Sequence, residues 1–162
     1  MSVEKVRAYL EPYGVADRIR EFDVSSATVE LAALAVGVEG ARIAKTLSFK
    51  IGEEPILVVA AGDAKVDNSK YKHFFGVKAK MLTADEAVAR IGHAVGGVCP
   101  FALPEDVKTY LDVSLKRFDT VFPAVGSAAS AIELTCDELE RCCGKNFTQW
   151  VDVCKGWQPE EA

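Results

Sequence analysis

The chain carries the segment IAKTLSFKI (residues 43–51), the turn GEEP (52–55) and the apolar run ILVVAA (56–61). From Thr46 onward the first segment alternates polar and apolar residues, as a strand does when only one of its faces is buried. The second segment has no polar residue, which is typical of a strand buried on both faces. The sequence therefore predicts a β-hairpin as the centre of the fold.

Helix start and stop signals surround this hairpin. Thr83 and Thr135 each precede a glutamate by three residues, which is the capping-box pattern at a helix start. Glycines at 14, 37, 76, 92 and 144 provide the stops. The pattern predicts helices over residues 3–13, 29–36, 67–75, 84–91 and 136–143, with the alanine-rich one at 29–36 expected to pack in the core. Short strands are expected at 19–23, 77–82, 107–112, 121–124 and 131–134, and a short docked segment around Trp150.

Helices and strands mix without strict alternation, and several strands are joined by turns of hairpin length. This organisation favours an α+β fold with a mixed or mainly antiparallel sheet surrounded by helices over a doubly wound fold. At 162 residues the chain is long enough for one compact domain, 1–162. We expect residues 158–162 to form a disordered tail.

Composition excludes several classes of function. A net charge of −5 argues against a protein that coats nucleic acid indiscriminately. Five cysteines and two histidines show no zinc-ligand spacing, so we expect no metal site. No apolar run approaches the roughly 20 residues that span a bilayer, so we expect no membrane contact. Since the first residues lack the apolar core of a signal peptide, we expect a cytoplasmic protein.

Charge is concentrated in one segment. Residues 65–80 contain a single aspartate against five lysines: Lys65, Lys70, Lys72, Lys78 and Lys80. A basic patch on an acidic body can meet a phosphate backbone locally. A solvated helix face is the alternative interpretation of the same run.

A glycine-rich stretch, Gly96-Gly97-Val98-Cys99-Pro100-Phe101, predicts a rigid loop. Glycine lets a ligand approach the main chain, and proline fixes its own φ and withholds a donor. Backbone N–H groups in such a loop can hold an anion or a carbonyl oxygen that gains charge during a reaction. A tight turn that ends a strand is the alternative. Lys45 begins the hairpin, where its amine can reach a phosphate, hydroxyl or carboxylate, or simply face solvent.

These pieces, in this order, resemble the YbaK/EbsC family, which is similar to the editing domain inserted in bacterial prolyl-tRNA synthetases. The resemblance covers residues 15–155. It rests on 43–47, Gly62-Asp63 with Val66-Asp67, and 96–100, and it continues through Asp112, Phe118-Asp119, 125–127 and 132–135.

The resemblance implies a curved sheet around a pocket and hydrolysis of the ester that links a wrong amino acid, such as Cys or Ala, to tRNA(Pro), without a metal or organic cofactor. Lys45 corresponds to a lysine near the terminal adenosine, and Gly96 and Gly97 belong to the loop whose amides hold the scissile carbonyl. Mischarged tRNA and prolyl-tRNA synthetase are the implied partners. Substrate contacts are expected from Phe22, Thr28, Phe49, Val98, Cys99, Pro100, Gly126 and Ser127.

An aminoacyl ester is already activated, so its hydrolysis requires mainly positioning and oxyanion stabilisation. A Ser-His-Asp set is therefore not needed, and neither His73 nor His93 has a sequence partner that suggests a triad. One branch of the family has a basic Gly-Lys-Arg-Gly loop where this chain has 126–129. We expect the tRNA-binding charge to come instead from Lys65, Lys70 and Lys72.

Two other functions stay open. One is a non-catalytic module that binds tRNA or a synthetase and regulates it. The other is a hydrolase of small esters or thioesters that uses Cys99, where many relatives have serine. We favour Cys99 as a residue of the pocket wall, because no base stands next to it in the sequence.

Overall fold

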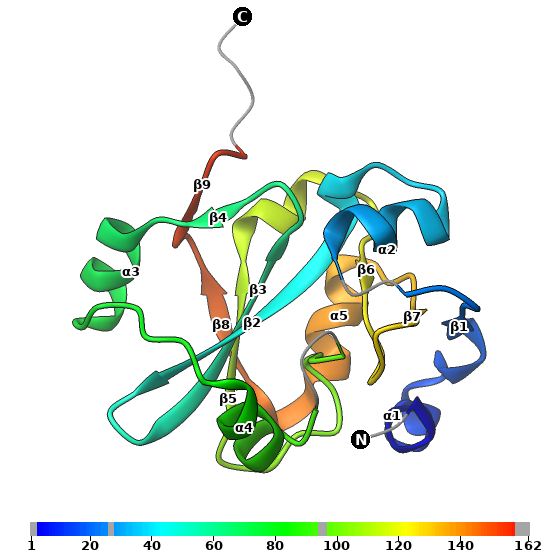
Figure 1. The fold of residues 1–162 in the computed structure, drawn as a ribbon, viewed down its shortest axis with the longest axis horizontal. Helices are drawn as coiled ribbons and strands as arrows, with labels where there is room; N and C mark the ends of the chain where they lie inside the picture. Colours follow the sequence, from blue (N-terminus) through cyan, green and yellow to red (C-terminus); the bar gives the residue numbers. More distant parts are fainter. Residues whose placement is uncertain (1–2, 26–27, 94–96, 158–162) are drawn as a thin grey trace, which may run out of the picture.

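The predicted hairpin lies at the centre of the fold. The computed structural model describes residues 3–25, 28–93 and 97–157. In it, β2 (Ile43–Ile51) and β3 (Glu54–Ala61) pair antiparallel from Ala44 opposite Ala61 to Ile51 opposite Glu54. Every residue of β3 after Glu54 is buried, as the unbroken apolar run predicted. Figure 1 shows the hairpin crossing the middle of the molecule.

Three further strands of the described residues extend this hairpin into a sheet of order β6-β2-β3-β5-β8. β5 (Lys108–Asp112) runs parallel to β3, and β8 (Phe147–Val151) runs parallel to β5. On the other edge, β6 (Phe122–Pro123) runs parallel to β2. The sheet is therefore mixed, and its outer pairings are parallel. β8 replaces the short docked segment that we expected around Trp150.

Two small ribbons lie beside the sheet. β1 (Arg20–Glu21) pairs antiparallel with β7 (Ser130–Ala131), and β4 (Lys65–Val66) pairs antiparallel with β9 (Cys154–Lys155). The strand expected at 77–82 is wrong, because this segment meets β2 through one bridge, between Met81 and Phe49.

The helices begin and end close to their predicted positions. They are α1 (Val3–Leu10), α2 (Val29–Val36), α3 (Asn68–Phe75), α4 (Ala84–Glu86) and α5 (Cys136–Cys143). Both predicted capping boxes are present, at Thr83 with Glu86 and at Thr135 with Glu138. No helix in the described ranges combines the length and apolar character that a membrane crossing requires.

Short helical turns complete the described elements. α4 continues as a π-helical turn, η4 (Ala87–Ile91), before Gly92. The 3₁₀ turns are η1 (Glu11–Tyr13), η2 (Ala16–Arg18), η3 (Gly40–Arg42), η5 (Val113–Arg117) and η6 (Gly144–Asn146). The predicted tail, 158–162, lies outside the described residues.

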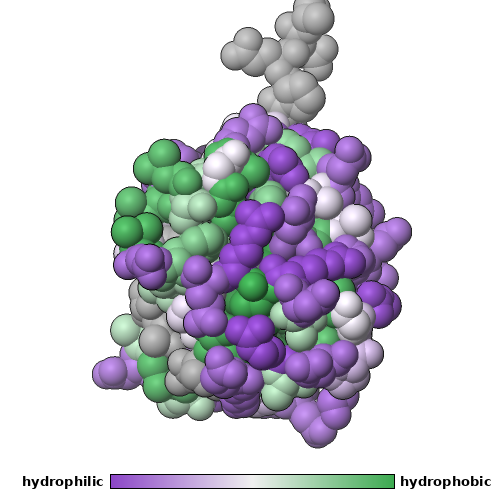
Figure 2. All heavy atoms as spheres, turned by 90° about the vertical axis from the view of Figure 1, so that its right-hand side faces the viewer, coloured by the Kyte–Doolittle hydropathy of each residue, from purple (hydrophilic) through white to green (hydrophobic). Residues whose placement is uncertain are grey.

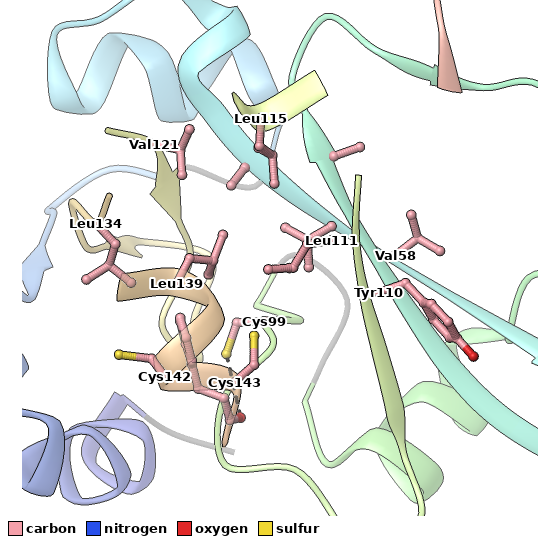
Figure 3. Packing of buried hydrophobic residues seen from close by; sticks show 14 of the residues in the cluster. Val58, Cys99, Tyr110, Leu111, Leu115, Val121, Leu134, Leu139, Cys142 and Cys143 are labelled. Atoms are coloured by element: carbon pink, nitrogen blue, oxygen red, sulfur yellow. Dashed lines mark hydrogen bonds between the residues drawn. The ribbon is translucent and has the colours of Figure 1, made fainter. Parts of the chain in front are cut away.

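One large hydrophobic cluster joins the sheet to α5 and α1. Figure 3 shows Val58 and Leu111 on the sheet side and Leu139, Cys142 and Cys143 on α5. A second, smaller cluster joins α2 to β2 and β6 through Ala32, Ala33, Ile43 and Phe122. Small alanine side chains let α2 pack closely on that edge, while its outer residue Leu34 stays 79% exposed. Figure 2 shows the side of the molecule nearest α2 and β1 as largely hydrophilic, with apolar residues gathered at its upper left.

Candidate functional site

A pocket of about 350 Å³ lies between β2, α2 and the residues on either side of α4. This volume is at the lower end of the range for small-molecule sites in proteins. β2 lines it with 43–48, and α2 lines it with Val29 and Ala32, next to the N-cap residue Thr28. The remaining lining residues are Met81, Leu82, Ala87, Val98, Phe122, Ala124, Ser130 and Ala131. The helix that we expected to be only a core element therefore also forms one side of the pocket.

Lys45 is the basic residue of this lining. Its Nζ donates to the carbonyl oxygen of Ala64 and lies 3.5 Å from that of Gly62. Burial lowers the pKa of Lys45 below its usual value, because the charged form loses hydration. The amine is thus held at the pocket by the loop that follows β3, which is a fixed position from which it can meet a substrate oxygen.

Thr46 contributes a hydroxyl that sequence reasoning missed. Its Oγ1 is buried and has no hydrogen-bond partner among the described residues. A buried hydroxyl without a partner costs about 1–3 kcal/mol. Since Thr46 lines the pocket, a bound ligand can supply the missing partner. The sequence carried no signal for this role, because adjacent residues of a strand point to opposite faces.

The two glycine-containing loops that the sequence singled out are in contact. Gly97 is buried, and a Cβ added to it would lie 2.9 Å from the N and Cα atoms of Ser127 and 3.0 Å from the carbonyl carbon of Gly126. These backbone atoms cannot move aside easily, so the close approach requires glycine at position 97. Val98, the next residue, lines the pocket. Gly96 lies outside the described residues.

Cys99 faces the core rather than the pocket. The side chain is fully buried, and its Sγ lies 3.6 Å from His93 Nε2 and 3.9 Å from the carbonyl oxygen of Phe101. Burial raises the pKa of the Cys99 thiol to about 12. A thiol in this state is neither ionised at neutral pH nor reachable by a substrate, so Cys99 lacks the properties of a nucleophile.

The other predicted substrate contacts do not line the pocket. Phe49 is buried against the Tyr71 ring, with centroids 5.2 Å apart. The N–H of Phe22 donates to the carbonyl oxygen of Ala129, which fixes the approach to α2. Pro100 is buried beside Cys99. Of the predicted contact residues that the structure describes, Thr28, Lys45 and Val98 are the ones that line the pocket.

The predicted tRNA-binding lysines differ in their surroundings. Lys65 and Lys72 are exposed. Lys70 instead donates its Nζ to Asp152 Oδ1 at 3.1 Å and to the carbonyl oxygen of Cys154 at 3.0 Å. The described residues hold no cluster of three or more His, Cys, Asp or Glu side chains arranged to bind a metal ion.

Comparison with known proteins decides the family. Residues 24–142 match the model of the aminoacyl-tRNA editing domain. The chain belongs to this family. The matched region contains all the residues that line the pocket, from Thr28 to Ala131.

Curated relatives agree with this membership. The chain is 52% identical over 160 residues to the uncharacterized protein YwhH of Bacillus subtilis (strain 168), covering 98% of this chain and 100% of that protein. It is 28% identical over 125 residues to EbsC of Enterococcus faecalis (strain ATCC 700802 / V583), which is provisionally named a Cys-tRNA(Pro)/Cys-tRNA(Cys) deacylase; the match covers 75% of this chain and 76% of EbsC. A proline–tRNA ligase of Latilactobacillus sakei is 30% identical over 90 residues, which are 55% of this chain and 16% of the ligase.

A solved structure has the same fold. The crystal structure of a protein provisionally assigned as a trans-editing enzyme for prolyl-tRNA synthetase superimposes with a TM-score of 0.85 at 28% identity, over 96% of this chain and 99% of that one. The resemblance to the prolyl-tRNA synthetase editing domain and to EbsC is confirmed.

Proposed function

We propose that residues 1–162 act as one trans-editing domain, a cytoplasmic aminoacyl-tRNA deacylase that hydrolyses the ester of a mischarged tRNA. The substrate we assign is tRNA(Pro) carrying a non-cognate amino acid such as Cys or Ala. The observation that carries this proposal is the small pocket that joins Lys45 on β2 to the loop residue Val98, inside the region that matches the editing-domain model.

In this proposal, backbone amides rather than side chains stabilise the charge that develops during the reaction. The amides of the loop at Gly96 and Gly97 stabilise the oxyanion that forms when water attacks the ester carbonyl. Loss of one donor of this kind typically costs about 10²–10³-fold in rate. Lys45 holds the terminal adenosine, and the Thr46 hydroxyl, which lacks a partner among the described residues, bonds to a polar atom of the substrate. A general base from a Ser-His-Asp set is not required, because the ester is already activated.

The pocket limits which amino acid can enter. Alanine, valine and leucine side chains dominate its lining, with a volume of about 350 Å³. An apolar cavity discriminates one methylene by about 1–3 kcal/mol, so selection works by excluding larger side chains. Outside the pocket, Lys65 and Lys72 contact the tRNA, and prolyl-tRNA synthetase is the proposed partner.

The test is a panel of mischarged tRNAs incubated with wild-type protein and with Lys45→Ala. We expect wild type to release a small non-cognate amino acid from tRNA(Pro), and Lys45→Ala to lose at least about 10²-fold in kcat/KM, because substrate positioning is lost. Lys108→Ala is the matched control, since Lys108 is an exposed lysine at the start of β5.

Wild-type protein that releases no amino acid from any tRNA of the panel would contradict the proposal. If such inert protein still bound tRNA tightly, the non-catalytic module would be the correct function. The third candidate, a Cys99-dependent hydrolase, is disfavoured because the Cys99 thiol is sealed in the core.

A further inference from the structure

The β4–β9 ribbon places two lysines side by side. Lys65 and Lys155 are direct partners in the antiparallel register, so their side chains leave the ribbon on the same face. Both residues are exposed. Like charges directly opposite each other in a sheet are destabilising. We refer to Lys65 and Lys155 as the lysine pair; its presence works against the stability of the ribbon that carries it.

Nearby carboxylates are bonded to other groups. Asp63 binds Arg117 with both oxygens, at 2.6 and 3.0 Å. Asp67 Oδ1 accepts the backbone N–H of Lys70 at 3.0 Å and so caps α3. Asp152 binds the Nζ of Lys70. The positive charge of Lys155 helps to lower the pKa of Asp67, so this carboxylate lies within its field. Among the described residues no direct ion pair joins a carboxylate to Lys65 or Lys155, and both side chains are exposed to solvent.

The lysine pair adjoins the pocket through a fixed connection. Lys45 Nζ bonds to the carbonyl oxygen of Ala64, the residue immediately before Lys65. Just after the other strand, β9, Arg117 Nη1 donates to the carbonyl oxygen of Trp157 at 3.0 Å while the same guanidinium binds Asp63. This bonding ties both strands of the ribbon to the loop after β3, and Figure 1 shows β4 and β9 together at the end of the hairpin where β3 ends.

We propose that the lysine pair binds phosphate groups of the acceptor end of the tRNA whose aminoacyl ester occupies the pocket. The inference rests on the proposed function, because a substrate ester in this pocket is attached to a polyanion. Phosphates between the two ammonium groups would remove their repulsion and release counterions from the nucleic acid. A nucleic acid is favoured over an acidic protein as the ligand, because Lys65 directly follows Ala64, whose carbonyl oxygen binds Lys45 at the pocket.

The test compares wild type with Lys65→Gln, Lys155→Gln and the double variant. Binding of uncharged tRNA is measured by titration at several salt concentrations, so this arm does not depend on turnover. We expect the double variant to bind about tenfold more weakly at low salt and to lower the slope of log K against log salt by about 1.4–1.8, which is two phosphate contacts. Its melting temperature should equal or exceed that of wild type, because the like-charge contact is gone.

A second arm measures hydrolysis of mischarged tRNA and of the same amino acid esterified to adenosine alone. The double variant should raise KM for the tRNA more than KM for the adenosine ester, since the short substrate has no phosphates to contact. Lys108→Gln, at the opposite end of β3 from the ribbon, is the matched control.

The two arms separate the inference from the function on which it rests. Unchanged tRNA affinity and salt slope in the double variant would overturn the inference even if wild type cleaves both esters. Loss of tRNA binding in the double variant would support it even if wild type cleaves neither, in which case the proposed function is the part that fails.

Discussion

The two sides of the segment 97–101 face different surroundings. Val98 lines the pocket, whereas Cys99 is buried in the core beside His93. The side chain with the more reactive chemistry thus lies on the side that a substrate cannot reach. In a glycine-rich loop, the type of a residue therefore does not reveal its role. The role depends on the side of the loop to which the side chain points.

Buried polar atoms without hydrogen-bond partners also have different consequences at the pocket and in the core. Thr46 Oγ1 and His93 Nδ1 both lack hydrogen-bond partners in the described part of the chain. Thr46 lines the pocket, so a ligand can satisfy its hydroxyl. His93 is fully buried in the core, so its Nδ1 stays unsatisfied and lowers stability. Variants on the pocket side should therefore change substrate choice, and variants on the core side should change folding stability.

Of the variants that compare the two sides, one that fills the pocket should have the largest effect. Ala124 lines it and is partly exposed, so Ala124→Leu can extend into the cavity without disturbing the core. We expect kcat/KM for the preferred mischarged tRNA to fall at least about 10-fold, because one methylene in an apolar pocket is worth about 10–200-fold and leucine adds three carbon atoms. Ala8→Leu, on the exposed side of α1, is the control. Equal rates for both variants would mean that the amino acid binds elsewhere.

A smaller effect should follow from Cys99→Ser on the core side. We expect kcat/KM to stay within about threefold of wild type, which is less than 1 kcal/mol of activation free energy. Burying a hydroxyl in place of a thiol should lower the free energy of unfolding by about 1–3 kcal/mol, measured in urea. A covalent acyl adduct on Cys99 of the wild type, or complete loss of activity in the variant, would reverse our assignment of the two sides.

The smallest effect is a pH dependence of stability from His93. Burial lowers the pKa of His93, and the charge on Lys5 acts in the same direction. The unfolded chain therefore takes up a proton near pH 6.5 while the folded protein does not, so stability is full above about pH 6.5 and falls as the pH drops below it. Urea unfolding at pH 7 and pH 5 measures this loss, and His93→Gln should reduce it.

Other titrating groups act at lower pH. Glu86 and Glu138 have pKa values of about 2, because Lys50 and Arg18 bond to them and each caps a helix. Their stabilisation is present above about pH 4.5 and is lost as the pH falls toward 2.

The test of His93 has a clear contrary outcome. If the free energy of unfolding changes between pH 7 and pH 5 by the same amount in His93→Gln as in wild type, His93 is not the group that causes the loss of stability.

The sequence could predict what depends on local pattern. The hairpin 43–61 was predicted because its alternation and its turn lie within one short stretch, and the capping boxes at Thr83 and Thr135 are local signals too. β8 was missed because the segment FTQWV has only Val151 buried, and its partner β5 is distant in the chain. The segment 77–82 has strand composition, yet it meets only one bridge partner.

For the site, the sequence found Lys45, Thr28 and Val98, which stand in the recognisable motifs or at a helix cap. It could not find the cavity formed beside Ala32, because a volume arises only when α2 packs on β2. It also placed Cys99 on the pocket, since no spacing in a loop reveals which side a side chain takes. The structure shows this direction: Cys99 lies beside His93 in the core, while Gly97 packs against the backbone of Ser127.

The order of strands also has a consequence for synthesis of the protein. A ribosome releases the chain from its N-terminal end, so β2 and β3 can pair soon after they emerge, whereas β8 follows β5 after a long interval. During that interval the nascent chain carries β5, whose last four residues are buried in the finished protein, with one edge unpaired. An open, apolar strand edge is the feature that other chains join by mispairing. While the segment before Phe147 is being translated, this edge of β5 is the part of the sheet open to such mispairing.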